Sequence, residues 1–347
     1  MKPQISENSG RSASLPRRAI GTTSLTVPTL GFGAAGIGNL YRVTSDADAA
    51  DALHAAFAAC ITYVDTAPHY GQGLSERRVG AALTPSVIVS SKVGRVLEPI
   101  TPPAPGTERH GFIDGDPFEP VYDYSYDGIL RSFASSLRRL NRDRLDIVLV
   151  HDLGQATHGA DADRHMRAFL DGGLRALTEL KASGAATAIG LGVNEWQVAA
   201  DVMRHADLDT VLLAGRYTLL EQESLTAFLP DCLRCQVSII LGGPFNSGIL
   251  VGDMHYNYDV APPAIVARVR ALQRVCDAHG VPLAAAALQF PLAHPAVACV
   301  IPGMVSRRQV EANMTLLNTD IPAALWRDLK GEHLLHPDAP VPEKVAL

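Results

Sequence analysis

The chain has 347 residues, of which 47% are hydrophobic and 19% charged, and its formal net charge is −6. This acidic balance provides no basic surface for nucleic acid or an anionic membrane, and no apolar run reaches the ~20 residues that a membrane span needs. Five scattered cysteines are typical of reduced thiols in a cytoplasmic enzyme. The polar, serine-rich residues 1–16 lack the apolar centre of a secretory signal, and we expect them to form a disordered tail.

Apolar, β-branched runs alternate with helical patterns along the rest of the chain. The turn sequence GTTS within 17–28 first predicts a hairpin. Strands are then expected at 29–33, 62–67, 87–93, 146–151, 187–193, 210–215, 237–243 and 297–303, and helices at 46–60, 75–83, 126–140, 173–184, 195–206, 223–233, 261–280 and 306–317. This repeated alternation predicts an α/β fold, a (β/α)8 TIM barrel over 17–330 with the hairpin as its floor.

Two insertions interrupt this rhythm. Residues 94–123 are rich in proline, glycine and charge without periodicity, and residues 252–262 form a shorter loop. Long connections in compact domains are usually functional, and both insertions follow strands whose C-terminal ends face the catalytic side of a barrel. We therefore expect extended loops on the C-terminal face. The first insertion should wall a pocket, and the C-terminal tail, 331–347, should lie near its mouth.

Chemically unlike side chains stand at or just beyond the ends of three buried strands. Asp65 and Tyr70 occur in YVDTAPHYG, Lys92 in VIVSSKVG and His151 in DIVLVHD. The C-terminal ends of barrel strands converge on one face, so these groups predict a shared pocket. A tyrosine ionises near pH ~10, but an adjacent lysine cation favours the phenolate. A carboxylate would keep the lysine charged and an imidazole would position a substrate oxygen, so we expect a catalytic proton-transfer site.

At these residues the chain resembles the aldo-keto reductase superfamily. The order of the four side chains, together with SERRVG, LGGPFNSGIL and IPGMVSRRQVEANM, carries the resemblance over roughly residues 18–320. The segments HDLG and GRYTLLEQ are most similar to the sugar 1-dehydrogenase branch, of the L-fucose or D-threo-aldose type. The resemblance implies an NAD(P)-dependent oxidoreductase that oxidises an aldose of the L-fucose, L-galactose or D-arabinose type at C1 to the lactone, with Tyr70 as general base.

Other functions are compatible with the same residues. One alternative is pyridoxal 4-dehydrogenase activity, since pyridoxal also forms a cyclic hemiacetal, and another is general aldehyde or alcohol oxidoreduction. From a different class, a cofactor-sensing regulatory subunit like the potassium-channel β subunits uses the same fold. Turnover with NAD and a panel of sugars separates these classes.

The resemblance also implies where a nicotinamide dinucleotide binds. The LGGPFNSGIL loop would wrap the diphosphate, because glycines let backbone N–H groups approach it, and the helix after IPG would add a second anion site. Tyr217 corresponds to a tyrosine that stacks on the nicotinamide, and Asn194 to a carboxamide contact. The expected cofactor residues are Asn194, Tyr217, Gly242, Gly243, Pro244, Phe245, Ser247, Gly248, Gly303, Met304, Arg307, Gln309 and Asn313.

NAD is expected to be preferred over NADP. Many members that prefer NADPH place lysine, serine and arginine where Gly303, Met304 and Gln309 stand here, so the usual contacts for a 2′-phosphate are missing. Arg307 and Arg308 lie near enough in sequence to compensate, which leaves NADP as the alternative.

Candidate substrate contacts lie in the segments expected at the pocket mouth. His69, beside Tyr70, suits a contact with a substrate hydroxyl and a structural hydrogen bond equally well. The partner we expect is a small-molecule sugar or aldehyde, because these segments are rich in hydrogen-bonding groups. The candidates are His69, Tyr122 and His255, with Glu98, Asp114, Asp116 and Asn257 as further polar groups.

A pair of cysteines and a glycine-rich segment could indicate other kinds of site. Cys232 and Cys235 form a C-x-x-C, but no second ligand pair accompanies them, which favours ordinary helix thiols over a metal or redox site. The segment from Gly31 to Gly36 matches the dinucleotide fingerprint G-x-G-x-x-G. A true fingerprint opens a helix directly, whereas the next helix here is expected only at about Asp46, so we interpret these glycines as a barrel loop.

A third pattern is the seven-residue spacing of His151, His158 and His165. The intervening residues are expected to form a loop, which does not hold such a spacing on one face. We therefore expect no metal site.

Overall fold

A closed barrel of parallel strands forms the centre of the molecule. The computed structural model describes residues 14–257 and 259–343. Parallel bridges from Leu30 to Val300 and from Gly33 to Gly303 join the first strand to the last, so the predicted (β/α)8 barrel is confirmed. In order around the barrel the strands are β3 (Phe32–Gly33), β4 (Tyr63–Asp65), β5 (Ile88–Val93), β10 (Leu145–His151), β11 (Ala186–Val193), β12 (Thr210–Ala214), β13 (Ser238–Gly242) and β16 (Val297–Ile301).

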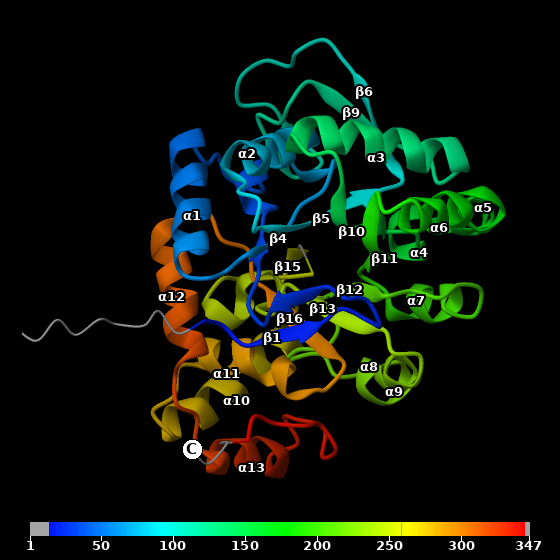
Figure 1. Cartoon of the computed structure of the whole chain (residues 1–347). Coiled ribbons are helices and arrows are strands. Elements are labelled where there is room, and N and C mark those ends of the chain that lie inside the picture. The colour runs from blue at the N-terminus through cyan, green and yellow to red at the C-terminus, as the bar shows by residue number, and fades with distance from the viewer. Residues whose placement is uncertain (1–13, 258, 344–347) are drawn as a thin grey trace, which may run out of the picture.

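Helices surround the strands on the outside of the barrel (Figure 1). Ser45, Ser125 and Ser306 cap three of them by accepting a hydrogen bond from the backbone N–H three residues on. No helix among the described residues is long and apolar enough to cross a membrane. The main helices are α1 (Asp46–Ala58), α2 (Leu74–Ala82), α3 (Tyr126–Leu140), α6 (Leu174–Ala182), α7 (Trp196–Val202), α8 (Ser224–Ala227), α9 (Leu229–Arg234), α10 (Pro263–Ala278), α11 (Leu283–Gln289), α12 (Arg307–Leu317) and α13 (Ala323–Gly331).

Most residues of the strands are apolar because both faces of each strand are buried. On β10, Ile147 and Leu149 point into the barrel and belong to its inner core. Val148 and Val150 belong to the larger core between the strands and the helices. This two-sided burial explains why the strands could be located in the sequence as continuous apolar runs.

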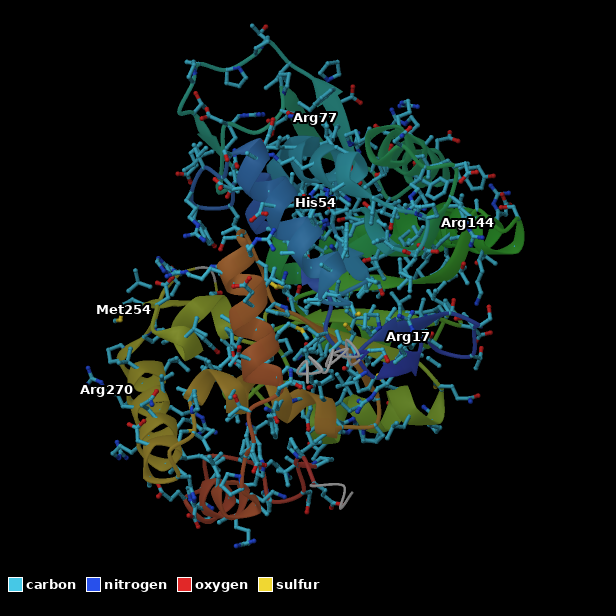
Figure 2. The ribbon with its side chains drawn as sticks, turned by 60° about the vertical axis from the view of Figure 1, so that its left-hand side comes forward. Arg17, His54, Arg77, Arg144, Met254 and Arg270 are labelled. Carbon is cyan, nitrogen blue, oxygen red and sulfur yellow. The ribbon has the colours of Figure 1, made fainter. Side chains whose placement is uncertain are left out.

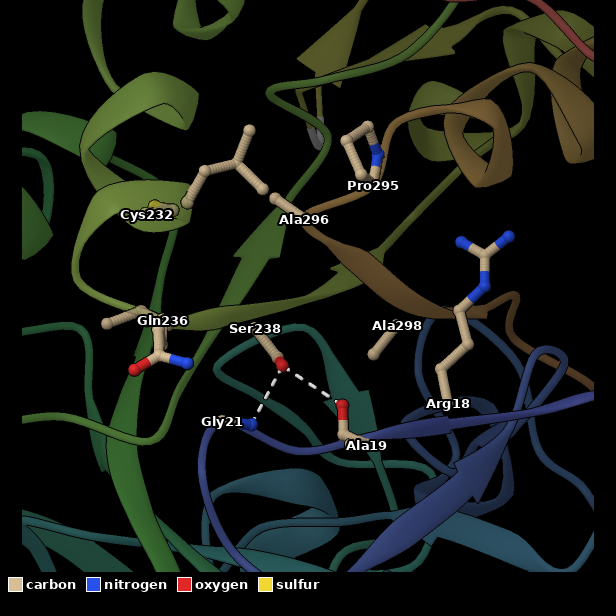
Figure 3. Close-up of a pocket in the computed structure, with 11 residues that line it drawn as sticks. Arg18, Ala19, Gly21, Cys232, Gln236, Ser238, Pro295, Ala296 and Ala298 are labelled. Atoms are coloured by element: carbon tan, nitrogen blue, oxygen red, sulfur yellow. Dashed lines mark hydrogen bonds between the residues drawn. The ribbon is translucent and has the colours of Figure 1, made fainter.

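The N-terminal hairpin forms the floor of the barrel, as expected. It consists of β1 (Arg17–Ala19) and β2 (Thr26–Pro28), and its Ile20 and Val27 complete the inner core. A cavity of about 340 Å³ lies between the hairpin and the start of β13 (Figure 3). There Gly21 N donates to Ser238 Oγ at 2.8 Å, and Ser238 Oγ donates to Ala19 O at 3.0 Å. This cavity is at the opposite end of the barrel from the strand C-termini.

Both chain ends pack on the barrel as far as they are described. Residues 1–13 of the expected disordered tail lie outside the described residues, whereas Leu15 is already buried. In the C-terminal tail, Leu334 and Leu335 are buried, and His336 N donates to Gln222 Oε1 in the loop after β12. The described part of this tail therefore contacts one of the loops on the C-terminal face.

The insertion at 94–123 is more regular than the sequence indicated. It contains two antiparallel pairs, β6 (Arg95–Pro99) with β9 (Phe118–Tyr122) and β7 (Glu108–Arg109) with β8 (Phe112–Ile113). These strands are too short, and too rich in proline, to show an alternating pattern. The second insertion likewise holds a small pair, β14 (His255–Tyr256) and β15 (Asp259–Val260). Next to it, Met254 lies at the edge of the molecule, 58% exposed (Figure 2).

The segment after β10 corrects another expectation. Residues between His151 and His165 were expected to form a loop, but they contain α4 (Gln155–His158) and the start of α5 (Ala162–Ala168). Gly154 and Gly159 flank the first of these helices. Because glycine is typical of turns, the segment had the sequence pattern of a loop. The rings of His158 and His165 consequently lie 4.1 Å apart between their centroids.

Candidate active site

The structure brings the side chains of Asp65, Lys92 and Tyr70 into direct contact. Lys92 Nζ lies 2.7 Å from Asp65 Oδ2, 3.0 Å from Thr66 O and 3.1 Å from Tyr70 Oη. Asp65 ends β4 and Lys92 is the next-to-last residue of β5, while Tyr70 begins the short helical turn η2 (Tyr70–Gly73). Three chain segments therefore meet at one ammonium group, at the C-terminal end of the barrel.

The surroundings of Lys92 fix its long side chain. Asp65 Oδ1 accepts from Ser90 Oγ at 2.7 Å, and that serine is paired with Tyr63 Oη at 2.8 Å. On β11, two strands away in the barrel, Gly192 leaves room for the lysine, because a Cβ there would lie 3.1 Å from Lys92 Cε. Lys92 is consequently 2% exposed and reaches its partners through a tightly packed channel.

The loop that carries Tyr70 is held by contact between two backbones. A Cβ at Gly38 would lie 2.8 Å from the carbonyl carbon of Tyr70. Gly71 has a φ of +62°, and a Cβ there would lie 2.4 Å from Gly38 O. The glycine-rich segment after β3 thus supports Tyr70 from behind. As predicted, no dinucleotide-type helix opens there, since only a 3-10 turn follows (Gly36–Gly38) and α1 begins at Asp46.

The charges in this cluster follow from burial and pairing. Burial alone would lower the pKa of Lys92, but Asp65 and Tyr70 outweigh it and the pKa is raised, so the group is an ammonium. Burial raises the pKa of Tyr70, and the lowering effect of Lys92 only partly offsets this. Lys92 therefore favours the phenolate, as expected, while burial keeps the pKa of Tyr70 above its usual value.

His151 is a neutral imidazole. Together with Asp65, Tyr70 and Lys92 it forms the four-residue cluster called the tetrad below. Burial, followed by the cations of Arg95 and Lys92, holds its pKa well below the usual value. Its ring lies 6.0 Å from that of Tyr70, edge to face. Its Nδ1 atom is buried and has no hydrogen-bond partner among the described residues. A neutral imidazole beside the phenol can donate a hydrogen bond to a substrate oxygen without competing for the proton.

His69 extends this pocket toward the first insertion. Its ring lies 6.0 Å from His151 and 5.4 Å from Phe112, which belongs to β8. Burial lowers the pKa of His69 to about 2, and its Nδ1 atom also lacks a partner among the described residues. The insertion therefore contributes a wall of the pocket, as expected, and His69 offers a second neutral imidazole.

The other substrate candidates lie farther from the tetrad. Tyr122 is 40% exposed and lies beneath the guanidinium of Arg95, 5.2 Å from its ring centroid. His255 pairs with Asp253 at 2.8 Å and stacks on Tyr41 at 6.1 Å, so it joins two loops away from the tetrad.

The carboxylates expected at the pocket mouth already have other partners. Glu98 pairs with Arg131 at 3.8 Å, and Asp116 with Arg77 at 2.9 Å. Asp114 accepts from Gly106 N at 2.5 Å within the insertion. Each of the three carboxylates therefore already has a partner within the insertion or on a helix beside it.

Loops after β13 and β16 expose bare backbone near the same end of the barrel. Gly243 has a φ of +58°, and Gly303 has no atom within 4 Å of the place that a Cβ would take. Beyond Pro244 and Phe245, the turn η5 (Asn246–Val251) is kinked at Ser247, with a φ of 59°, and at Gly248, with a φ of 102°. Side chains at Gly243 and Gly303 would fill this space, so the two glycines form an open cradle.

A model of the aldo/keto reductase family matches residues 29–331. The chain belongs to this family. Pyridoxal 4-dehydrogenase of Microbacterium luteolum is 42% identical over 334 residues, covering 92% of this chain and 98% of that protein. D-threo-aldose 1-dehydrogenase of a Pseudomonas species is 37% identical over 329 residues, covering 91% and 97%. The holo form of an aldo-keto reductase from Bacillus halodurans superposes with a TM-score of 0.73 at 25% identity, covering 95% and 99%.

Family membership makes the protein an oxidoreductase and implies a nicotinamide cofactor. The open cradle of Gly243 and Gly303 suits such a group, because a diphosphate needs close approach to backbone N–H groups. Asn194, after β11, is half-buried and directs its amide nitrogen to Asp152 Oδ1 at 3.1 Å. Gln309 and Asn313 instead hold α12 together, since Gln309 Oε1 accepts from Val305 N at 2.8 Å and Asn313 Nδ2 donates to Gln309 O at 2.9 Å.

Two expected cofactor contacts are not supported by their positions. Tyr217 is fully buried and packs on Phe290 and His294, each 5.3 Å away between ring centroids. No face of this ring is exposed, so the expected stacking on a nicotinamide is corrected. Met304 is also fully buried, and its side chain belongs to the core rather than to a phosphate site.

The cysteine pair and the spaced histidines form no ligand cluster. Cys232 is buried in α9 and Cys235 is exposed just beyond its end. His158 Nε2 lies 2.9 Å from Tyr124 Oη, which occupies that nitrogen. No group of three or more potential metal ligands occurs in the part of the chain that the structure describes.

Sequence reasoning missed the charged residues that adjoin the tetrad. Arg95 and Asp152 form an ion pair of 2.5 Å beside His151. Glu76 is fully buried on α2, where it accepts from Ser91 Oγ at 2.5 Å and from Arg139 Nε at 2.6 Å. A signal was present for Asp152, because a charge directly after a buried strand needs a partner.

Tyr70→Phe should abolish turnover and leave cofactor binding nearly intact. The phenolic oxygen carries the proton, and such groups typically contribute about 10²–10⁴-fold to the rate. Steady-state rates and a fluorescence titration with reduced cofactor measure the two properties separately. Retention of more than about a tenth of the wild-type rate would contradict the tetrad assignment.

Lys92→Met should shift the pH dependence of oxidation to higher pH. Oxidation requires the phenolate, and the substitution removes the cation that lowers the pKa of Tyr70 while leaving the Asp65 charge that raises it. The pKa of Tyr70 therefore rises further, and the rate climbs only at more alkaline pH. A profile of kcat/KM against pH checks this; an unchanged or acid-shifted profile would show that Lys92 does not tune the phenol.

Proposed function

We propose that this oxidoreductase oxidises an aldose at C1 to the lactone, on substrates of the L-fucose, L-galactose or D-arabinose type. The observation that carries the proposal is the contact of Lys92 with both Asp65 and Tyr70 beside the neutral His151. This arrangement moves one proton at an oxygen atom, which is what the oxidation of a hydroxyl or the reduction of a carbonyl requires.

A cyclic hemiacetal suits the polarity of the pocket. His69 and His151 both present neutral imidazoles, and His69 has a buried Nδ1 atom without a partner among the described residues. The nearby Arg95 is neutralised by Asp152. A substrate with several uncharged hydroxyl groups satisfies such atoms, whereas each one left unpaired would cost about 1–3 kcal/mol.

The oxidation divides into a hydride and a proton. The C1–H bond breaks with its electron pair, while the proton of the anomeric hydroxyl passes to the phenolate oxygen of Tyr70 as the C1–O double bond of the lactone forms. His151 orients that hydroxyl by hydrogen bonding. Lys92 and Asp65 hold the tyrosine oxygen in place and set its affinity for the proton.

The nicotinamide cofactor, when bound, accepts the hydride. Gly243, Ser247, Gly248 and Gly303 are the residues that we propose hold its diphosphate, with Asn194 on the carboxamide. We propose NAD as the preferred form, because Arg307 makes a two-point contact with Asp51 and both arginines of the loop, Arg307 and Arg308, are exposed.

Pyridoxal is the second candidate substrate. The relative named pyridoxal 4-dehydrogenase is 42% identical, more than the 37% of the relative named D-threo-aldose 1-dehydrogenase. Pyridoxal also closes to a cyclic hemiacetal, so the same proton and hydride transfers would yield a lactone from it. The two candidates differ in what adjoins the reacting carbon. In the sugars it is a ring that carries several hydroxyl groups, and in pyridoxal it is an aromatic ring.

Purified enzyme with NAD should oxidise L-fucose, L-galactose or D-arabinose, with a lactone as first product. The three sugars share one stereochemical pattern at the ring carbons nearest C1, so a site for one should accept the others. Absorbance of the reduced cofactor follows the reaction, and pyridoxal and simple alcohols are run beside the sugars. Failure of all three sugars with brisk oxidation of pyridoxal would replace the first candidate with the second.

NAD should exceed NADP by about tenfold or more in kcat/KM, because a 2′-phosphate needs charge-assisted hydrogen bonds that are missing here. Asp51→Ala should narrow this gap by releasing Arg307, while Glu332→Ala, at an exposed position after α13, serves as a control for the change of charge. A wild-type preference for NADP would show that Arg307 or Arg308 turns inward, and its alanine variant should then lose that preference.

A further inference from the structure

A buried ion pair adjoins the tetrad without taking part in the proton transfer. Arg95 Nη2 lies 2.5 Å from Asp152 Oδ2, and the two side chains are 6% and 13% exposed. Arg95 begins β6 just beyond the strand of Lys92, and Asp152 directly follows His151. Such pairs contribute little net stability, because the cost of removing two charges from water offsets their attraction. Its place beside the catalytic residues points to another role.

The backbone of Asp152 is fixed in an uncommon conformation. Its φ is 45°, in the left-handed region, which is unfavourable for most residues other than glycine. Its N–H donates to Gly192 O at 2.9 Å, and its carbonyl accepts from Tyr124 Oη at 3.2 Å. The same hydroxyl proton is shared with His151 O, the nearer acceptor at 2.7 Å. This turn directs the carboxylate across the ends of the strands.

The carboxylate determines how the Asn194 amide is oriented. Asn194 Nδ2 donates to Asp152 Oδ1 at 3.1 Å. An ionised carboxylate only accepts hydrogen bonds, so the nitrogen end of the amide must face Asp152 and the oxygen end must face away. Arg216 Nε donates to the backbone carbonyl of Asn194 at 2.8 Å and holds the chain there. The free amide oxygen is the atom that can accept from a carboxamide.

The carboxylate also acts on the imidazole of the tetrad. Asp152 Oδ2 lies 3.4 Å from His151 Nε2, an electrostatic contact rather than a hydrogen bond. A negative charge on this side favours the tautomer with its proton on Nε2. The opposite nitrogen, Nδ1, is buried without a partner among the described residues, which is consistent with an unprotonated atom there.

We propose that Asp152, held in place by Arg95, is a positioning residue that orients the Asn194 amide for the nicotinamide and the His151 Nε2 proton for the substrate oxygen. The proposal rests on the proposed function in one respect, the place of the nicotinamide beside Asn194. One carboxylate then sets the geometry on the cofactor side and on the substrate side, and Arg95 keeps that carboxylate charged and immobile.

Asp152→Asn tests this role with a side chain of equal size. The new amide can present either end to Asn194 and no longer attracts the Nε2 proton of His151. We expect reduced NAD to bind at least fivefold more weakly and kcat to fall at least tenfold, since small losses of orientation cost about that much or more. Fluorescence titration with reduced NAD and steady-state rates measure the two effects.

Variants of Arg95 test whether this residue holds the Asp152 carboxylate in place. Arg95→Met should reproduce the losses of Asp152→Asn, whereas Arg95→Lys keeps the positive charge and should restore most of the cofactor affinity. The double variant Arg95→Met with Asp152→Asn should be no worse than either single change, because both act through the same carboxylate. If Asp152→Asn fails to fold, the contrast between the two Arg95 variants decides the question.

Lys181→Met is the matched control, because it breaks an ion pair of 2.7 Å with Asp209 at the other end of the barrel. It should lower the melting temperature and leave cofactor affinity unchanged. Asp152→Asn or Arg95→Met variants that behave in the same way, losing stability alone, would overturn the positioning role. The titration needs only the cofactor, so its result is independent of whether sugars or pyridoxal are the substrate.

Discussion

The buried ammonium of Lys92 imposes the strongest constraint on this structure. A charge so deeply enclosed needs an opposite charge and hydrogen-bond acceptors on every side, or it would lose its proton. Asp65 supplies the opposite charge. Thr66 O and Tyr70 Oη accept hydrogen bonds from the ammonium of Lys92. Because these partners come from β4 and from the loop beyond it, the barrel must hold neighbouring strand ends in a fixed relation. The proton-transfer geometry is therefore a consequence of satisfying one buried cation.

The barrel was predictable from sequence because its strands are buried on both faces, which produces apolar runs such as that around Ile147. Periodic apolar patterns, such as that of α3, located most helices in the same way. The short pairs in 94–123 and the helix Gln155–His158 were not predictable. They are stabilised by contacts such as Arg109 Nη1 to Phe118 O at 2.6 Å, which join residues with no shared periodic pattern.

The tetrad could be predicted because each member stands at or just beyond a strand end, where the fold alone brings groups together. Burial was harder to foresee. The positions of Tyr217 and Met304 in the sequence carry no sign that the barrel encloses both side chains. The protonation of Tyr70 likewise depends on how much water the surrounding residues exclude. The pairing of Arg95 with Asp152 joins two strand ends and becomes visible only once the strands are placed next to each other.

The closure of the barrel has a consequence for how the protein is made. Its first strand, β3, is two residues long, and two bridges, from Leu30 to Val300 and from Gly33 to Gly303, close the seam between the first and the last strand regions. A growing chain must keep the edge of β3 unpaired until nearly the whole barrel has left the ribosome, and such edges are prone to aggregation. The open glycine cradle at Gly303 adjoins this seam. A dinucleotide held there would bind only the completed barrel, and by mass action would protect a newly synthesised molecule against reopening.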